Sequence, residues 1–200
     1  MSERAAWPIR AWYWFWIGVL YGLRLRRPLN SLQRRLQKER SEARLPLADL
    51  RTLDGLRAHL KPFDYRKDGS RIAGFFFPMD YVSDPEVFEA RLRSGAVADG
   101  DCDDFAHYAA TQLKRMGHDA YHVTIGYQGG GHVACVYRGK GDGTWYLMNY
   151  QTVTYLEHPQ DAEEHLLKWA TARRTRKHEK GTAKSRWLVF EDTNLKRVRL

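Results

Sequence analysis

Two glycine-rich turns divide the middle of the chain, and this pattern constrains the fold more than any other feature. Residues 129–131 are three glycines, and residues 139–143 alternate glycine with lysine and aspartate. The stretches beside them, 120–127, 132–138 and 144–151, are rich in apolar, β-branched and aromatic residues, as expected of strands. Turns this short join antiparallel neighbours, because a parallel crossover needs a dozen or more residues. The sequence therefore predicts an antiparallel sheet here.

Helix signals lie before and after these strands. One helix is predicted to begin at Asp84, a favourable N-cap residue followed by proline, and to end at Gly95. A second is predicted over 101–116 and a third over 159–172, and 173–184 is interpreted as a basic, glycine-containing linker. Helices that precede an antiparallel sheet predict the α+β class.

Composition describes a globular chain with an uneven charge. The 200 residues are 43% hydrophobic, and the formal net charge is +9. Residues 1–60 hold 12 basic and 5 acidic side chains and residues 166–200 hold 11 and 3, whereas residues 101–165 are acidic overall. No single basic stretch runs through the chain, so a nucleic-acid partner is not expected. Two cysteines exclude a disulfide scaffold and a four-thiolate zinc site.

The N-terminal segment is apolar first and basic afterwards. Residues 11–23 are uncharged and contain three tryptophans, and eight arginines and lysines lie between residues 24 and 44. A helix of this apolar length is about 20 Å long, too short to span a bilayer core of about 30 Å. An anchor on an anionic membrane surface through residues 1–44 fits the pattern, as does a helix packed on the domain or on a partner protein. We expect a helical segment over 1–45, a domain over 46–200, and a cytoplasmic location with peripheral membrane association as the alternative.

Three residues suggest a nucleophilic site. Cys102 lies at the predicted start of a helix, where the partial positive charge favours a thiolate. His132 opens a strand and Asn149 lies near the end of the next one. The midpoint between the two falls in the turn at Gly141, so hairpin pairing makes them neighbours. A thiol, a base and a group that orients the base are the components of a thiol nucleophile.

These residues occur in motifs that resemble a known family. Gly-Asp-Cys-Asp-Asp-Phe-Ala from Gly100, His-Val-Ala-Cys-Val-Tyr from His132 and Trp-Tyr-Leu-Met-Asn ending at Asn149 resemble the transglutaminase-like branch of the papain-like cysteine enzymes, and most of all the bacterial transglutaminase-like cysteine proteinases. The resemblance covers roughly residues 80–152. It implies a papain-like core with a cysteine-bearing helix on an antiparallel sheet.

The resemblance also implies roles for individual residues. Cys102 would be the nucleophile, His132 the general base and then acid, and Asn149 the residue that orients the imidazole. Most of this branch has aspartate at the third position, so Asn149 is a departure. Tyr81 would stand near the oxyanion, for which the backbone N–H of Cys102 is the stronger candidate donor.

A cofactor is not required by this chemistry, although the resemblance adds one candidate. Related proteinases hold calcium with acidic residues beside the cysteine, which makes Asp101 and Asp103 candidate ligands; plain helix capping is the alternative.

The predicted site and the family resemblance are compatible with three functions. The first is thiol-dependent hydrolysis of an amide or peptide bond through an acyl-enzyme, with a protein or peptide as substrate. The second is acyl transfer to an amine, as in transglutaminases. The third is a non-catalytic binding module attached to a membrane or a large assembly.

Overall fold

The computed structural model describes residues 15, 42–65, 69–72, 75–78, 82–94, 98–127, 130–176 and 182–200. Its helices and strands are listed here in chain order: α3 (Leu53–His59), β1 (Phe63–Tyr65), β2 (Gly69–Ile72), β3 (Phe75–Pro78), α4 (Pro85–Arg93), β4 (Ala98–Gly100), α5 (Cys102–Arg115), β5 (Asp119–Tyr127), β6 (Gly130–Arg138), β7 (Trp145–Asn149), β8 (Thr152–Leu156), the 3-10 turn η3 (Pro159–Asp161), α6 (Ala162–Arg176), β9 (Ser185–Glu191) and β10 (Arg197–Val198).

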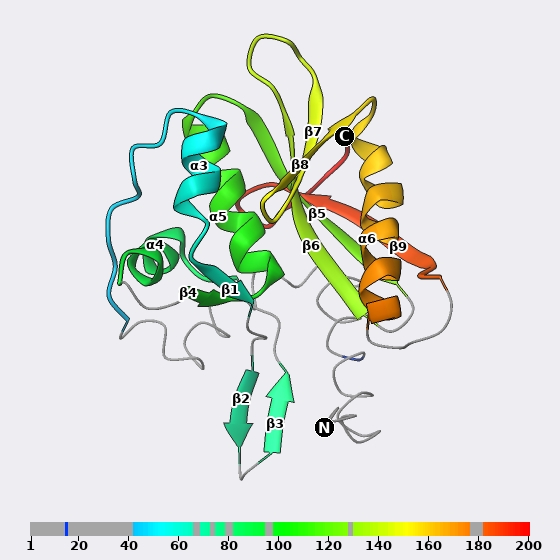
Figure 1. The fold of residues 1–200 in the computed structure, drawn as a ribbon, viewed down its shortest axis with the longest axis horizontal. Coiled ribbons are helices and arrows are strands. Elements are labelled where there is room, and N and C mark those ends of the chain that lie inside the picture. The colour runs from blue at the N-terminus through cyan, green and yellow to red at the C-terminus, as the bar shows by residue number, and fades with distance from the viewer. Residues whose placement is uncertain are drawn as a thin grey trace.

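A six-stranded antiparallel sheet forms the centre of the described structure. Its strands lie in the order β10-β9-β5-β6-β7-β8, so β5, β6, β7 and β8 form a meander of neighbours in sequence (Figure 1). Two smaller pairs lie outside this sheet: β1 runs parallel to β4, and β2 is antiparallel to β3. The α+β class predicted from the sequence is therefore confirmed.

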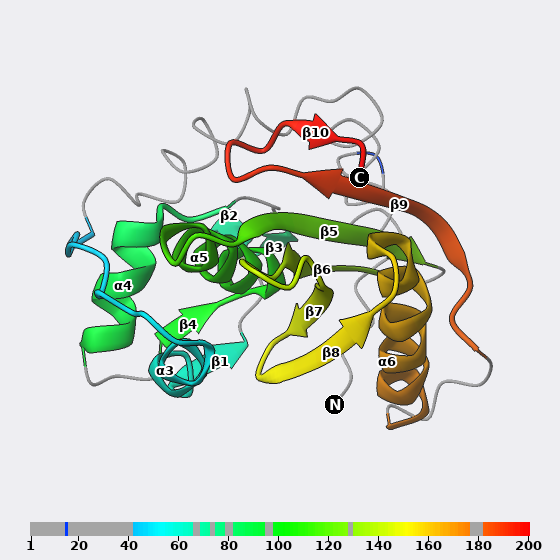
Figure 2. The ribbon, with the colours of Figure 1, turned by 90° about the horizontal axis from the view of Figure 1, so that it is seen from above.

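Helices cover both faces of the large sheet. The apolar side of α5 packs on Cys135 and Tyr137 of β6, whereas α6 packs on Ala134 and Val136 of the same strand. In Figure 2 the two helices lie on either side, with β6 between them. Because successive side chains of a strand point to opposite faces, a strand buried on both faces must be apolar throughout. This explains the continuous apolar stretches between the glycine turns.

The last long helix extends further than the sequence predicted. The predicted linker began at residue 173, but α6 continues to Arg176. Ala162, Leu166 and Ala170 are buried against the sheet at a spacing of four residues. This packing sustains the helix through a stretch whose basic composition had indicated a linker.

The N-terminal segment is described only near its end. Residues 42–50 contain no helix, so the helical segment predicted over 1–45 does not extend through its last four residues. Leu45 precedes a proline, which disfavours helix, and its N–H donates to the carbonyl of Glu86 at 3.1 Å. Arg44 forms an ion pair with Asp84 at 2.7 Å. The chain is thus fixed to α4 before the domain begins.

Some sequence predictions lie outside the described residues. These include the apolar and basic stretches before residue 42, apart from residue 15, and the oxyanion candidate Tyr81. Within the part of the chain that the structure describes, no helix combines the length and apolar character needed to cross a bilayer.

Candidate active site

The candidate nucleophile lies at the start of a helix, as predicted. Cys102 is the first residue of α5 and is half-buried. The side chain of Asp101 accepts a hydrogen bond from the N–H of Asp103 at 3.1 Å, and the side chain of Asp104 accepts one from the N–H of Asp101 at 3.3 Å. This reciprocal capping box fixes the first turn, and with it the sulfur, at the positive end of a 14-residue helix.

His132 and Asn149 are joined directly. The imidazole Nε2 lies 2.8 Å from the side-chain Oδ1 of Asn149. The pairing of Cys135 with Met148 sets the register of the β6–β7 hairpin, and this register places His132 and Asn149 on the same face of the sheet. An amide oxygen accepts a hydrogen bond, so Nε2 carries the proton and Nδ1 keeps the lone pair. Nδ1 is therefore the nitrogen that can act as a base.

The imidazole is enclosed by aromatic rings. His132 is only 2% exposed. The ring of Trp169, on α6, stacks on it with centroids 3.9 Å apart and planes 17° apart. Burial lowers the pKa of His132 to about 4; the hydrogen bond to Asn149 opposes this shift, and the charge of Arg173 adds to it. His132 is thus neutral at pH 7, which is the form that accepts a proton.

Tyr150 links the cysteine helix to the histidine strand. Its ring centroid lies 5.3 Å from that of Phe105, three residues after Cys102 on α5, and 5.4 Å from that of His132. Burial raises the pKa of Tyr150, and the nearness of Cys102 raises it further. The Tyr150 ring therefore meets both halves of the candidate site.

The backbone at Tyr150 is unusual, and neighbouring contacts hold it. Its φ is 52°, in the left-handed region that aromatic residues rarely adopt. The next residue, Gln151, donates from its side chain to the carbonyl of Leu60 at 3.0 Å and accepts from Arg57 at 3.1 Å through its own carbonyl. These bonds anchor the β7–β8 turn to the end of α3.

Tyr65, the last residue of β1, also lies near the cysteine. It pairs with Gly100 in the parallel β1–β4 ladder, and Gly100 is two residues before Cys102. Burial raises the pKa of Tyr65 and the charge of Cys102 raises it further, whereas Arg173 acts in the opposite direction. The guanidinium carbon of Arg173 lies 5.0 Å from the centre of the Tyr65 ring. Two tyrosines and one arginine therefore surround the start of α5.

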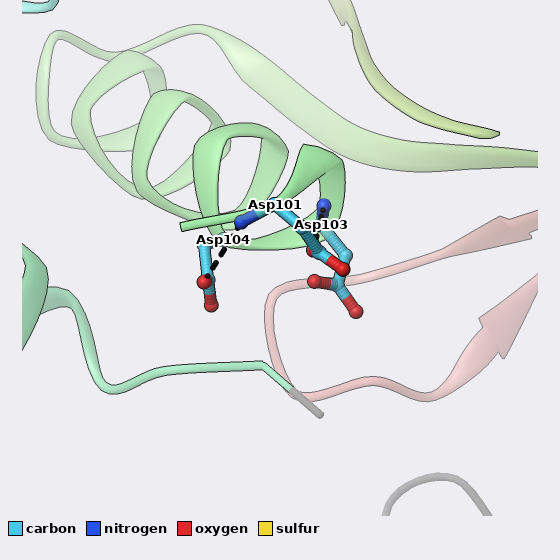
Figure 3. Close-up of side chains that lie close together, drawn as sticks. All are labelled: Asp101, Asp103 and Asp104. Atoms are coloured by element: carbon cyan, nitrogen blue, oxygen red, sulfur yellow. Dashed lines mark hydrogen bonds between the residues drawn. The ribbon is translucent and has the colours of Figure 1, made fainter. Parts of the chain in front are cut away.

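Three carboxylates gather at the same helix start. One ligand atom from each of Asp101, Asp103 and Asp104 lies within 4.8 Å of the others, and all three residues are buried (Figure 3). Asp104 also accepts from the N–H of Ser83 at 2.7 Å, and burial raises the pKa of its carboxyl group. Capping accounts for the bonds of Asp101 and Asp104, so a calcium ion at Asp101 and Asp103 stays a prediction.

The remaining cysteine belongs to the core. Cys135 is fully buried between α5 and the sheet, and burial raises the pKa of its thiol. Its side chain points to the face opposite His132, as strand alternation predicted.

The sequence reasoning missed four residues of this site: Tyr65, Tyr150, Trp169 and Arg173. Only the two residues on α6 left a readable signal. Trp169 and Arg173 are four residues apart, the spacing that places side chains on one helix face, but the helix was predicted to end between them. Comparison with known proteins adds no assignment, because no family model, curated protein or solved structure matches the chain.

Proposed function

We propose that this protein is a thiol hydrolase that cleaves an amide or peptide bond, with a transglutaminase-like, papain-like core. The observation that carries the proposal is the 2.8 Å contact between His132 Nε2 and Asn149 Oδ1. This contact uses Nε2 to orient the imidazole ring and leaves Nδ1 able to accept a proton. Tyr150, which meets the rings of both His132 and Phe105, connects this pair to the helix of Cys102.

The reaction would proceed in two halves. The sulfur of Cys102 attacks the carbonyl carbon while Nδ1 of His132 takes the thiol proton, giving a tetrahedral oxyanion near the N–H of Cys102. The imidazolium then protonates the leaving amine, the C–N bond breaks, and a thioester remains. Water, deprotonated by His132, attacks the thioester and releases the acid and the thiol. Asn149 holds the ring throughout but, being neutral, adds no charge to stabilise the imidazolium.

Alkylation of the two cysteines tests the proposal without knowledge of the substrate. Iodoacetamide at pH 7 should modify Cys102 far faster than the buried Cys135, with mass spectrometry assigning the two sites. His132→Ala should slow the Cys102 reaction by about 100-fold, the scale of a general base. His165→Gln on α6 is the matched control and should leave the rate unchanged. Equal rates in wild type and His132→Ala would rule out the Cys–His pair.

Two generic substrates distinguish the possible reactions. Release of fluorescence from quenched fluorescent casein reports hydrolysis, and incorporation of dansylcadaverine into casein reports acyl transfer. Hydrolysis that disappears in Cys102→Ser supports the proposal. Incorporation without hydrolysis would establish the acyl-transfer alternative, and a Cys102 that does not react with iodoacetamide would favour the non-catalytic module.

A further inference from the structure

Arg173 occupies an unusual position for a cation. It lies on α6, and its guanidinium carbon is 5.3 Å from the centre of the Trp169 ring and 5.0 Å from that of Tyr65. Trp169 in turn stacks on His132 at 3.9 Å. The Trp169 ring therefore contacts both the positive charge and the candidate base.

Arg173 also contacts the β1–β4 pair, which leads into the cysteine helix α5. Tyr65, beneath the guanidinium, pairs with Gly100 immediately before the start of α5. Arg173, Trp169, Tyr65 and Cys102 are all half-buried, so each keeps some solvent-accessible surface.

Arg173 has more N–H donors than its hydrogen bond to the Tyr65 side chain uses. Among the described residues, no carboxylate lies within ion-pair distance of its guanidinium. A hydrogen bond to the Tyr65 side chain engages part of the N–H edge of Arg173, and the remaining N–H groups of the planar fork are the ones that can bind a planar anion. The nearby hydroxyl of Tyr150 is buried and makes no hydrogen bond to a described residue. Buried polar atoms usually have partners, so this hydroxyl is a candidate hydrogen-bonding group for a bound ligand.

We propose that Arg173 binds a carboxylate of the acyl substrate, so that the substrates carry an acidic group beside the bond that Cys102 attacks. This inference rests on the proposed thiol chemistry. The guanidinium would donate hydrogen bonds to the carboxylate through its N–H edge. Contacts with the Trp169 and Tyr65 rings would hold the plane of the guanidinium. The bound acyl group would be aligned with the start of α5 before sulfur attack.

Paired alkylating reagents test this without a known substrate. Iodoacetate and iodoacetamide both form an S–C bond to Cys102 with loss of iodide, and they differ in that only iodoacetate is anionic. 4-Maleimidobutyrate and N-ethylmaleimide form a second pair, whose carboxylate lies further from the sulfur. Within each pair, the ratio of the anionic rate to the neutral rate cancels any change in the amount of thiolate.

Arg173→Gln should lower this ratio about tenfold in at least one pair, the scale of one charge-assisted hydrogen bond. Arg173→Lys should lie between wild type and Arg173→Gln, because lysine keeps the charge and loses the planar fork. Lys168→Gln is the matched control: it removes a positive charge from the same helix, where Lys168 pairs with Glu164 at 2.6 Å on the surface. Its ratio should equal that of wild type.

The failures of the two proposals are distinguishable. If Cys102 of the wild type reacts no faster than Cys135, the thiol chemistry fails and the anion site fails with it. If Cys102 reacts fast but Arg173→Gln leaves both ratios unchanged, or Lys168→Gln lowers them equally, only the anion site is overturned.

Discussion

The molecule holds two buried polar clusters that treat charge in opposite ways. The Glu89 cluster consists of Glu89, His59, Arg93 and Tyr108, and it joins α3, α4 and α5. The His132 cluster consists of His132, Asn149, Tyr150 and Trp169, and it lies where β6, the β7–β8 turn and α6 meet. The first surrounds a charged group with donors, whereas the second encloses a neutral ring.

Glu89 shows what a satisfied buried charge requires. Its side chain is fully buried and accepts hydrogen bonds from the Tyr108 hydroxyl, the Arg93 guanidinium and the N–H of Ala48, the last at 3.2 Å. His59 Nε2 lies 3.2 Å from it. Burial by itself would raise the pKa of Glu89, but these bonds and the charge of His59 outweigh burial and lower it.

His132 is the contrasting case. Burial dominates and lowers its pKa to about 4, while only Asn149 supports the protonated form. A carboxylate with every oxygen engaged fixes architecture, because any change of charge is costly. An imidazole with one nitrogen committed and one available is suited to proton transfer. The first cluster is therefore suited to a structural role, and under the proposed function the second carries the proton transfer.

The largest expected effect belongs to the Glu89 cluster. Glu89→Gln should lower the free energy of unfolding by about 3 kcal/mol, because it leaves Arg93 and His59 facing a neutral group in a buried site. Urea unfolding measures the change. Glu164→Gln, which removes a carboxylate from an exposed pair with Lys168, should cost far less, because solvent screens such a pair. If Glu89→Gln lowers the free energy of unfolding by less than about 1 kcal/mol, the buried charge of Glu89 does not stabilise the fold as proposed, and the contrast between the two clusters fails.

The pH dependence of stability should separate the clusters next. The imidazole has an ordinary pKa of 6.5 and a pKa of about 4 when folded. Between these two pKa values the unfolded chain binds more protons than the folded protein. The contribution of the neutral His132 ring to the free energy of unfolding is therefore complete above pH 6.5. It is lost as pH falls toward 4, by up to about 3 kcal/mol. The carboxyl of Glu89, whose pKa is lowered from 4.5, loses its contribution only as pH falls below that value.

Unfolding of wild type and His132→Gln at pH 7 and pH 4.5 measures this difference. The wild type should lose more stability than the variant over this interval, because the variant lacks the titrating ring. The ring protons of His132 in NMR spectra give a second, direct measurement. A titration midpoint near 6.5 would show that burial does not control the ring.

The two clusters also differ in how far the sequence could predict them. The helix start at Cys102 and the contact between His132 and Asn149 were predictable, because a helix start and a two-strand hairpin are local patterns whose geometry follows from spacing. The placement of Glu89 was not, since two of its partners, His59 and Tyr108, lie 30 residues before it and 19 residues after it along the chain. Tyr65 and Arg173 were missed for the same reason: a parallel pairing of β1 with β4 and the packing of α6 on the sheet are long-range outcomes.

A carboxylate at position 149 should make the His132 cluster resemble the Glu89 cluster, because a buried charge would then lie beside the imidazole. Asn149→Asp places a negative charge 2.8 Å from Nε2 and should raise the pKa of His132 by about one to two units. NMR titration of the ring measures the shift, and faster alkylation of Cys102 at pH 7 should accompany it. Thr152 pairs with Asn149 across the hairpin and is exposed, so Thr152→Asp is the matched control and should shift the pKa far less. Equal shifts in both variants would show that the contact itself is not decisive.

The smallest expected effect comes from removing one hydroxyl from each cluster. Tyr108 donates its O–H to Glu89, so Tyr108→Phe should lower the free energy of unfolding by about 1–2 kcal/mol. The hydroxyl of Tyr150 is buried without a partner among the described residues, so Tyr150→Phe removes a desolvated group and loses no bond. Stability should therefore stay unchanged or rise by up to about 1 kcal/mol. Urea unfolding of the two variants side by side decides the matter. A loss in Tyr150→Phe as large as that in Tyr108→Phe would mean that Tyr150 is satisfied within the fold, and its hydroxyl would no longer support a ligand beside Arg173.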